Sequence, residues 1–80
     1  MPKLFSARGF RFFFYSNEKN EPCHVHVKGH GGEAKFWMPG CEMVFSYRLS
    51  AKDIRNILEI LRENASLIEE GWNEFFKSGH

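Results

Sequence analysis

The sequence predicts a single α+β domain in which an antiparallel β-meander of three to four strands precedes a long C-terminal amphipathic helix. Two observations lead to this prediction. Strand-like segments separated by turn-forming residues fill the first 50 positions, and after them the apolar residues recur at helical spacing. The length of 80 residues, with 42% apolar and 26% charged positions, suits one globular domain. We therefore expect one domain over residues 1–80, with the sheet in 8–49 and the helical part in 50–77.

Turn-forming residues divide the predicted sheet into its strands. The first strand is expected in the aromatic-rich FRFFFYS, which ends at the polar NEKNEP. A hairpin follows, because HVHVK alternates strictly, GHGG supplies turn residues and EAKFWM returns. After PG, the segment CEMVFSYRL completes the meander. The predicted strands thus cover residues 10–16, 24–28, 33–38 and 41–49.

The helix is predicted from its start signal and from one apolar stripe. Ser50 with Asp53 three residues later has the sequence form of a capping box. Beyond it, nine apolar residues fall within an arc of about 100°. They are Ile54, Ile57, Leu58, Leu61, Ala65, Ile68, Trp72, Phe75 and Phe76.

The length of this helix leaves two arrangements open. A continuous helix over 51–77 would extend about 40 Å, whereas strands of five or six residues make a sheet only about 17–20 Å tall. Either the helix kinks or splits near Asn64 and folds back, with Gly71 as another candidate for a kink, or its second half packs on another chain. Ile60 and Leu67 lie off the main stripe and favour an additional contact.

The register of the hairpin decides which way its histidines face. An even loop pairs residues whose numbers sum to 61, whereas an odd loop would mix apolar and polar side chains on both faces. One face then carries Val25, Val27, Ala34 and Phe36 and lies under the helix. The other carries His24, His26, Lys28, Glu33, Lys35 and Trp37, and we expect it to project into solvent. On the neighbouring strands we expect Phe10, Phe12, Phe14, Met43 and Phe45 inward, and Arg11, Phe13, Tyr15, Glu42, Ser46 and Arg48 outward.

Two imidazoles on one strand face are compatible with metal binding. His24 and His26 could reach one ion, with His30 or Glu33 as a further ligand. The sequence has no C-x-x-C or H-x-x-x-H pair, and strand alternation turns Cys23 to the opposite face from His24. We therefore predict no metal site and no cofactor.

Two other interpretations of the histidines are phosphoryl chemistry and packing. In RNA cleavage, two imidazoles could serve as base and acid while Lys35 stabilises the developing phosphate charge. Arg11 or Arg48 could take the same role, and Trp37, Phe13 or Tyr15 could stack an unpaired base. In the packing interpretation, both imidazoles fill the strand face and hold the NEKNEP loop by hydrogen bonds, while Trp37 covers their carbon edges. Whether the protein is an enzyme stays open at this point.

Charge and hydropathy narrow the classes of partner. The first 50 residues carry seven Lys/Arg against four Glu, and residues 51–80 carry four Lys/Arg against six Asp/Glu. A surplus of three on the sheet is too small for strong nonspecific binding to nucleic acid, so a protein partner ranks above RNA. The sequence contains neither a signal peptide nor the about 18 consecutive apolar residues of a membrane span. We expect a cytoplasmic protein without membrane contact, and Cys23 and Cys41 as free thiols.

Several stretches of the chain are characteristic when taken together: MPKLF, RFFFYSNEKNEPCHVHV, GEAKFW, LSAKDIRNILEILREN and GWNEFF. Over nearly all 80 residues they resemble the small bacterial proteins grouped as domain of unknown function 4160. The resemblance implies a cytoplasmic protein often encoded beside a second small protein, an arrangement like that of toxin–antitoxin modules. The family signature maps onto Glu21, Pro22, His24, His26, Glu33, Lys35 and Trp37.

We therefore predict a toxin–antitoxin-type component that acts through a protein partner, with the histidine-bearing face as its recognition or active surface. A ribonuclease toxin is the sharper form of this hypothesis; a non-catalytic nucleic-acid-binding or structural interaction module is the alternative. The candidate catalytic residues are His24, His26 and Lys35. The candidate binding residues are Arg11, Tyr15, Glu21, Glu33, Trp37 and Arg48. The candidate partner interface, in a heteromeric complex or a homodimer, comprises Ile60, Leu67, Trp72, Phe75 and Phe76.

Overall fold

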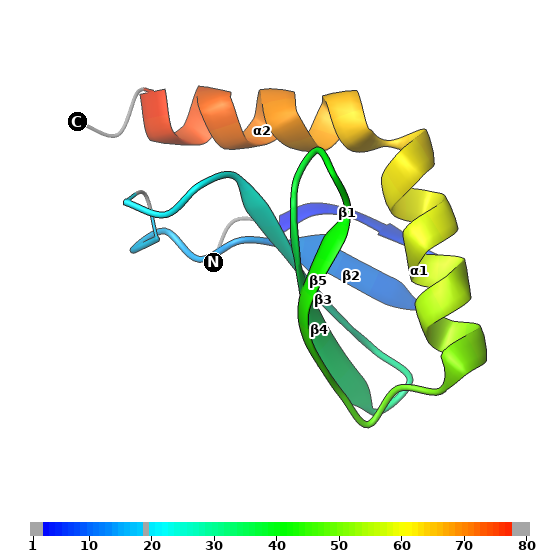
Figure 1. The fold of residues 1–80 in the computed structure, drawn as a ribbon. Coiled ribbons are helices and arrows are strands. Elements are labelled where there is room, and N and C mark those ends of the chain that lie inside the picture. Colours follow the sequence, from blue (N-terminus) through cyan, green and yellow to red (C-terminus); the bar gives the residue numbers. More distant parts are fainter. Residues whose placement is uncertain (1–2, 19, 78–80) are drawn as a thin grey trace.

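The computed structural model describes residues 3–18 and 20–77, which form one antiparallel sheet followed by two helices (Figure 1). The strands are β1 (Lys3–Ala7), β2 (Phe10–Phe13), β3 (His24–Gly29), β4 (Gly32–Trp37) and β5 (Glu42–Tyr47). The helices are α1 (Ala51–Glu63) and α2 (Ala65–Lys77). The sheet order is β1-β2-β3-β4-β5, with every neighbouring pair antiparallel. The α+β class and the meander are thus confirmed, but the sheet has five strands rather than three to four, and the helical part is split into two helices.

The strand that the sequence analysis missed is β1, which lies before the expected start of the sheet. It pairs with β2, and its register shifts between Lys3 and Phe5. Phe5 stacks on Phe12 at a centroid distance of 4.6 Å. Leu4 lies under α2, where a Cβ added to Gly71 would sit 2.5 Å from its Cδ2 atom. Gly71 therefore permits close packing of helix on strand and is not a kink.

The β3–β4 hairpin has the predicted register. Val27 pairs with Ala34, His26 with Lys35, and the remaining pairs also sum to 61. The turn consists of only His30 and Gly31, whose φ angles of 53° and 84° are those of a type I′ hairpin turn. The apolar face is fully buried and forms the centre of the core with α1 and α2. This core includes Phe12, Val25, Val27, Ala34, Phe36, Ile57, Leu61 and Ile68.

The helical part breaks at Asn64, which decides between the two arrangements left open above. Ser50 and Asp53 form the expected capping box at the start of α1. At its end, the Asn64 side chain donates to the Ile60 carbonyl oxygen at 2.8 Å, and the Asn64 carbonyl accepts from Ile68 at 3.0 Å. In Figure 1, α1 runs along one side of the sheet and α2 turns to run across its end. The apolar stripe therefore stays on this chain's own core.

The expectation that Met43 and Phe45 point into the core was wrong for Phe45, whereas Met43 lies on the core face but is 51% exposed. The β4–β5 register shifts between Lys35 and Phe36, so Lys35 lies opposite Phe45 while Phe36 lies opposite Met43. Val44 is the extra residue of this bulge. Its two neighbours, Met43 and Phe45, therefore point to opposite faces of the sheet instead of the same face. Ser46, expected outward, consequently lies opposite the buried Ala34. Every residue of β5 is exposed.

Within the described residues, neither helix has the length and apolar character needed to cross a membrane. Cys23 and Cys41 are free thiols.

Candidate functional site

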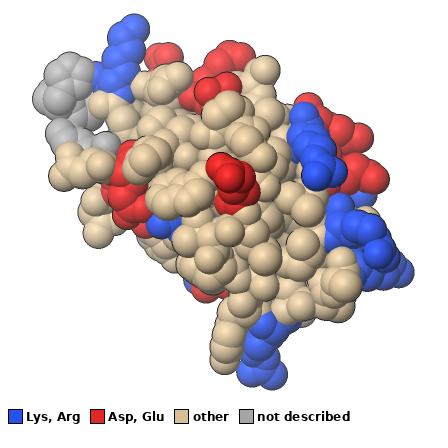
Figure 2. Space-filling model, viewed as in Figure 1, with Lys and Arg blue, Asp and Glu red and all other residues tan. Residues whose placement is uncertain are grey.

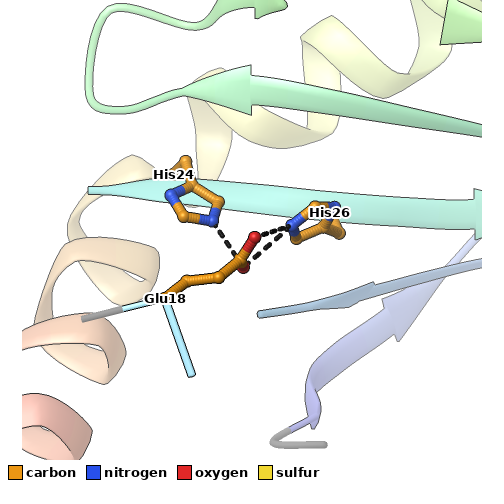
Figure 3. Close-up of side chains that lie close together, drawn as sticks. All are labelled: Glu18, His24 and His26. Carbon is orange, nitrogen blue, oxygen red and sulfur yellow. Dashed lines mark hydrogen bonds and ion pairs between the residues drawn. The ribbon is translucent and has the colours of Figure 1, made fainter. Parts of the chain in front are cut away.

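Two imidazoles and a carboxylate converge beside β3. His24 and His26 share one face of this strand, and the connection between β2 and β3 folds back so that Glu18 lies between them (Figure 3). The Glu18 Oε1 atom lies 2.7 Å from His24 Nε2 and 3.0 Å from His26 Nε2. Its Oε2 atom lies 3.2 Å from the same nitrogen of His26. We call Glu18, His24 and His26 the His–Glu cluster.

Both imidazoles of the cluster are buried, so the prediction that they project into solvent was wrong, while the Glu18 side chain is 16% exposed. His24 is 0% exposed and His26 5%, although both lie on the predicted face, opposite the core valines. Around His24 stand the rings of Trp37 and Trp72, at 5.7 and 4.7 Å. Around His26 stand those of Phe13 and Tyr15, at 5.6 and 4.7 Å. The strand face is polar, but a loop and aromatic rings seal it.

This arrangement favours the packing interpretation of the histidines. Glu18 belongs to the NEKNEP loop, and its hydrogen bonds to His24 and His26 tie that loop to β3. The ring of Trp37 lies against His24, as that interpretation expects. Sequence reasoning missed Glu18 itself. The available signal was a carboxylate six and eight residues before two histidines, in a loop long enough to fold back over them.

Burial and hydrogen bonding shift the pKa values of this cluster in opposite ways. Burial raises the pKa of Glu18, but the hydrogen bonds from His24 and His26 outweigh it, so the net pKa lies below the ordinary value. Burial lowers the pKa of His26, and the opposing effect of Glu18 does not cancel it. Near neutral pH, Glu18 is therefore ionised and His26 neutral. The His26 Nδ1 atom is buried and has no hydrogen-bond partner among the described residues.

Lys35, the third candidate catalytic residue, is engaged elsewhere. Its Nζ atom lies 2.7 Å from the Glu21 carboxylate and 4.8 Å from the centroid of the Trp37 ring. These three predicted site residues thus form an ion pair with a cation–π contact along the edge of the His–Glu cluster. Lys35 is bound to an acid rather than presented to a phosphate.

The other predicted binding residues do not complete an active site. Arg11 is exposed. In the sheet register it lies opposite Lys28, which in turn lies opposite Glu33, so Arg11 and Glu33 lie towards the turn of the hairpin. His30, considered above as a metal ligand, lies in that turn and contacts Asp53 at 3.3 Å. Arg48 is exposed at the end of β5. The described part of the chain encloses no pocket that would bring these side chains together.

The predicted partner interface divides into buried and exposed residues. Ile60 and Trp72 are buried in this chain's own core and are not available to a partner. Trp72, Phe75 and Phe76 pack around Phe14, with ring centroids 5.3 to 5.4 Å from it. Leu67 and Phe75 remain exposed.

A second exposed apolar group lies on β5 and was not predicted. Met43, Val44, Phe45 and Tyr47 are 51%, 42%, 42% and 62% exposed. In the space-filling view, most Lys and Arg side chains lie towards the margins, and the centre is largely free of them (Figure 2). The sequence signal was the position of this strand, because the last strand of a meander is an edge with no successor to cover it.

Comparison with known proteins gives one match. A family model described as a domain of unknown function, DUF4160, matches residues 9–73. This range contains the His–Glu cluster, β5 and most of both helices. No curated protein and no solved structure matches the chain.

Proposed function

The chain belongs to the DUF4160 family, and we propose that it is the protein-binding component of a toxin–antitoxin-type pair whose partner adds a strand to β5. The observation that carries this proposal is the exposure of all six residues of β5, including four large apolar ones. The proposed partner is the second small protein that, as the family resemblance implies, is often encoded beside this one.

An edge strand offers hydrogen-bonding groups to an incoming chain. β5 is last in the sheet order and pairs on one side only, with β4. The N–H and C=O groups along its other side are therefore open to a partner strand, which is the mode of recognition called β-augmentation. Many proteins protect such edges with lysine, proline or a β-bulge. Glu42–Tyr47 contains neither lysine nor proline, and with its bulge at Val44 all six residues are still exposed.

The side chains of β5 indicate what kind of strand would fit. Phe45 and Tyr47 lie opposite Lys35 and Glu33 and therefore point to one face. A matching partner strand carries apolar side chains at alternate positions on that face. Glu42 precedes this apolar pair and Arg48 follows it, so opposite charges at the two ends of the partner strand would set its direction.

The buried His–Glu cluster supports the non-catalytic form of this function. A ribonuclease needs an acid and a base within reach of a 2′-hydroxyl and a leaving oxygen, whereas both imidazoles here are sealed by rings and bonded to Glu18. Lys35 is likewise paired with Glu21. The apolar edge of β5, by contrast, is the kind of surface that proteins use to bind proteins.

The experiment is to co-express the chain with the protein encoded beside it and to measure their affinity. The double variant Phe45→Arg/Tyr47→Arg should bind at least about 10-fold more weakly, because it loses two aromatic anchors. Leu67→Arg is the matched control, since Leu67 is equally apolar and exposed but lies on α2. It should bind like the unsubstituted chain, and circular dichroism should show that all three proteins are folded.

Three results would contradict the proposal. The first is no association with the neighbouring protein. The second is an affinity that depends on Leu67 and not on Phe45 and Tyr47. The third is a homodimer, seen by light scattering, that dissociates in the Phe45→Arg/Tyr47→Arg variant, because a second copy would then occupy the edge. The non-catalytic form would be overturned by RNA cleavage that His24→Ala and His26→Ala each abolish in folded protein.

A further inference from the structure

We infer that the His–Glu cluster binds a divalent transition-metal ion of the zinc class, held by His24, His26 and Glu18. This site is separate from the β5 edge and does not depend on the function proposed for it. Its role is structural, since an ion held there would fasten the connection between β2 and β3 onto the sheet.

The first argument is the convergence of ligand atoms. One ligand atom from each of the three residues lies within 4.8 Å of the other two, and Figure 3 shows both imidazoles directed at the carboxylate. Around a tetrahedral ion with bonds of 2.0 to 2.2 Å, ligand atoms are about 3.3 Å apart. Small shifts of Glu18, which lies in a loop rather than in the sheet, would bring the ligands to that spacing.

The second argument comes from counting protons on His24. Its Nδ1 atom lies 2.9 Å from the Pro22 carbonyl oxygen, which can only accept, so Nδ1 must carry a hydrogen. Its Nε2 atom faces another oxygen, Glu18 Oε1, at 2.7 Å. A neutral ring with one hydrogen would direct a lone pair at that oxygen. Either an additional proton or a cation must therefore lie between these two atoms.

A cation between His24 Nε2 and Glu18 Oε1 would remove the need for an additional buried proton there. It would be bound by the Nε2 lone pair, while the Nδ1–H group continues to donate to Pro22. Backbone carbonyls often accept in this way from a metal-binding histidine, which fixes the tautomer and the ring orientation. Glu18 would remain ionised and supply the oxygen ligand.

His26 fits the same assignment. Its Nε2 atom lies near both Glu18 oxygens, at 3.0 and 3.2 Å, so one ion could be shared by this nitrogen and the carboxylate. The rings of Phe13 and Tyr15 hold the imidazole in place. Burial of both imidazoles lowers the local dielectric and so strengthens the attraction between the carboxylate and a cation.

The type of donor atom indicates the class of ion. Two imidazole nitrogens and one carboxylate are the ligands of several zinc sites, whereas magnesium and calcium prefer oxygen alone. Three protein ligands leave a fourth position for water in a tetrahedral site.

The test is zinc binding by protein purified without a metal-affinity tag and stripped with a chelator. Calorimetric titration with Zn²⁺ should show one equivalent bound, and the melting temperature should rise by about 10–20 °C at a free Zn²⁺ concentration 100 times the Kd. Glu18→Gln and His26→Gln should each weaken binding by more than about 100-fold. His30→Asn is the matched control, because His30 also lies beside a carboxylate, that of Asp53, and Asn-Gly suits the type I′ turn.

Spectroscopy guards against variants that fail to fold. In the unsubstituted chain, Zn²⁺ should shift the ¹⁵N resonances of Nε2 in His24 and His26 and leave those of His30 in place. Failure of the unsubstituted chain to bind Zn²⁺ would overturn the inference. So would binding that Glu18→Gln and His26→Gln, shown to be folded, both retain, or that His30→Asn removes.

Discussion

Strands β3 and β5 have six residues each and belong to the same sheet. The strand with the histidines is the buried one, and the strand with the large apolar residues is the exposed one. β3 begins with two histidines, and its first four residues are buried. β5 carries Met43, Val44, Phe45 and Tyr47, and all of its residues are exposed. Position in the sheet therefore decides burial here more than hydropathy does. The central strand β3 is covered, and the edge strand β5 is exposed along its whole length, whereas β1, at the other edge, packs Leu4 and Phe5 against the core.

The covering of β3 shows how two imidazoles are buried with a hydrogen bond to each, although His26 Nδ1 has no partner among the described residues. β2 and β4 flank β3, the helices cover its valine face, and the loop that carries Glu18 covers its histidine face. Burial of a polar group is costly unless a hydrogen bond replaces the lost water. Glu18 supplies such bonds to both imidazoles.

The largest expected contrast is between a phenylalanine in the buried centre of the sheet and one on the β5 edge. Phe36, on β4 opposite Val25 of β3, is 0% exposed, and Phe45 of β5 is 42% exposed. Phe36→Ala should lower the free energy of unfolding by about 3–5 kcal/mol because it leaves a cavity, and Phe45→Ala should lower it by less than about 1 kcal/mol. Urea denaturation measures both, and Phe36→Leu provides a milder step if Phe36→Ala is unfolded. Equal losses would mean that β5 is not an open edge.

A smaller contrast concerns two glutamates. Glu18→Gln removes charge-assisted hydrogen bonds to two buried imidazoles and should cost about 2 kcal/mol in the presence of a chelator. Glu59→Gln removes an ion pair to Arg8 in which both side chains are about half exposed, and it should cost under about 1 kcal/mol. Urea denaturation of the two variants under the same conditions compares them. A loss of stability from Glu59→Gln as large as that from Glu18→Gln would contradict the conclusion that Glu18 bonds to buried imidazoles.

The smallest expected contrast is in the reactivity of two cysteine thiols, one just before each strand. Burial, with a smaller contribution from Glu69, raises the pKa of Cys23, just before β3, to about 11. Burial also raises the pKa of Cys41, just before β5, but Arg62 opposes it. The thiolate is the reactive form, so a rise from 9.0 to about 11 leaves Cys23 about 100-fold less thiolate at pH 8 than an unperturbed cysteine.

Alkylation by iodoacetamide at pH 8 tests this difference. Single-cysteine proteins, made by Cys41→Ser and Cys23→Ser, should differ in rate, with Cys23 the slower. Because the folded protein holds the Cys23 proton more tightly than the unfolded chain, this group should also lower stability as pH rises from about 9 towards 11. Faster alkylation of Cys23 than of Cys41 would contradict the difference in environment.

Local patterns were enough to predict the hairpin. The β3–β4 register followed from loop parity, because only an even loop separates Val25 and Val27 from His24 and His26. The length of the helical stretch left two arrangements open, a break near Asn64 or packing of its second half on another chain, and the structure has the break. The capping box at Ser50 and Asp53 was equally local.

The missing parts of the fold depend on contacts that leave no periodic signal. Burial of the histidines depends on Glu18, which lies in an irregular loop and meets His26 only after the chain reverses. The bulge at Val44 shifts which residues of β5 face the core by a single position, and no residue type marks it. β1 was missed because KLFSA is short and ends a few residues before a much stronger strand signal.

The most direct test of the contrast between β3 and β5 is amide hydrogen exchange of the isolated protein, followed residue by residue by NMR. The amides of Val25, His26 and Val27, in the centre of the sheet, should exchange at rates set by global unfolding. The outward amides of Glu42–Tyr47, which point away from β4, should exchange several orders of magnitude faster. This result would support a sealed histidine strand and an open apolar edge. Amides of β3 that exchange as fast as the outward amides of β5, or β5 amides all as slow as those of β3, would contradict it.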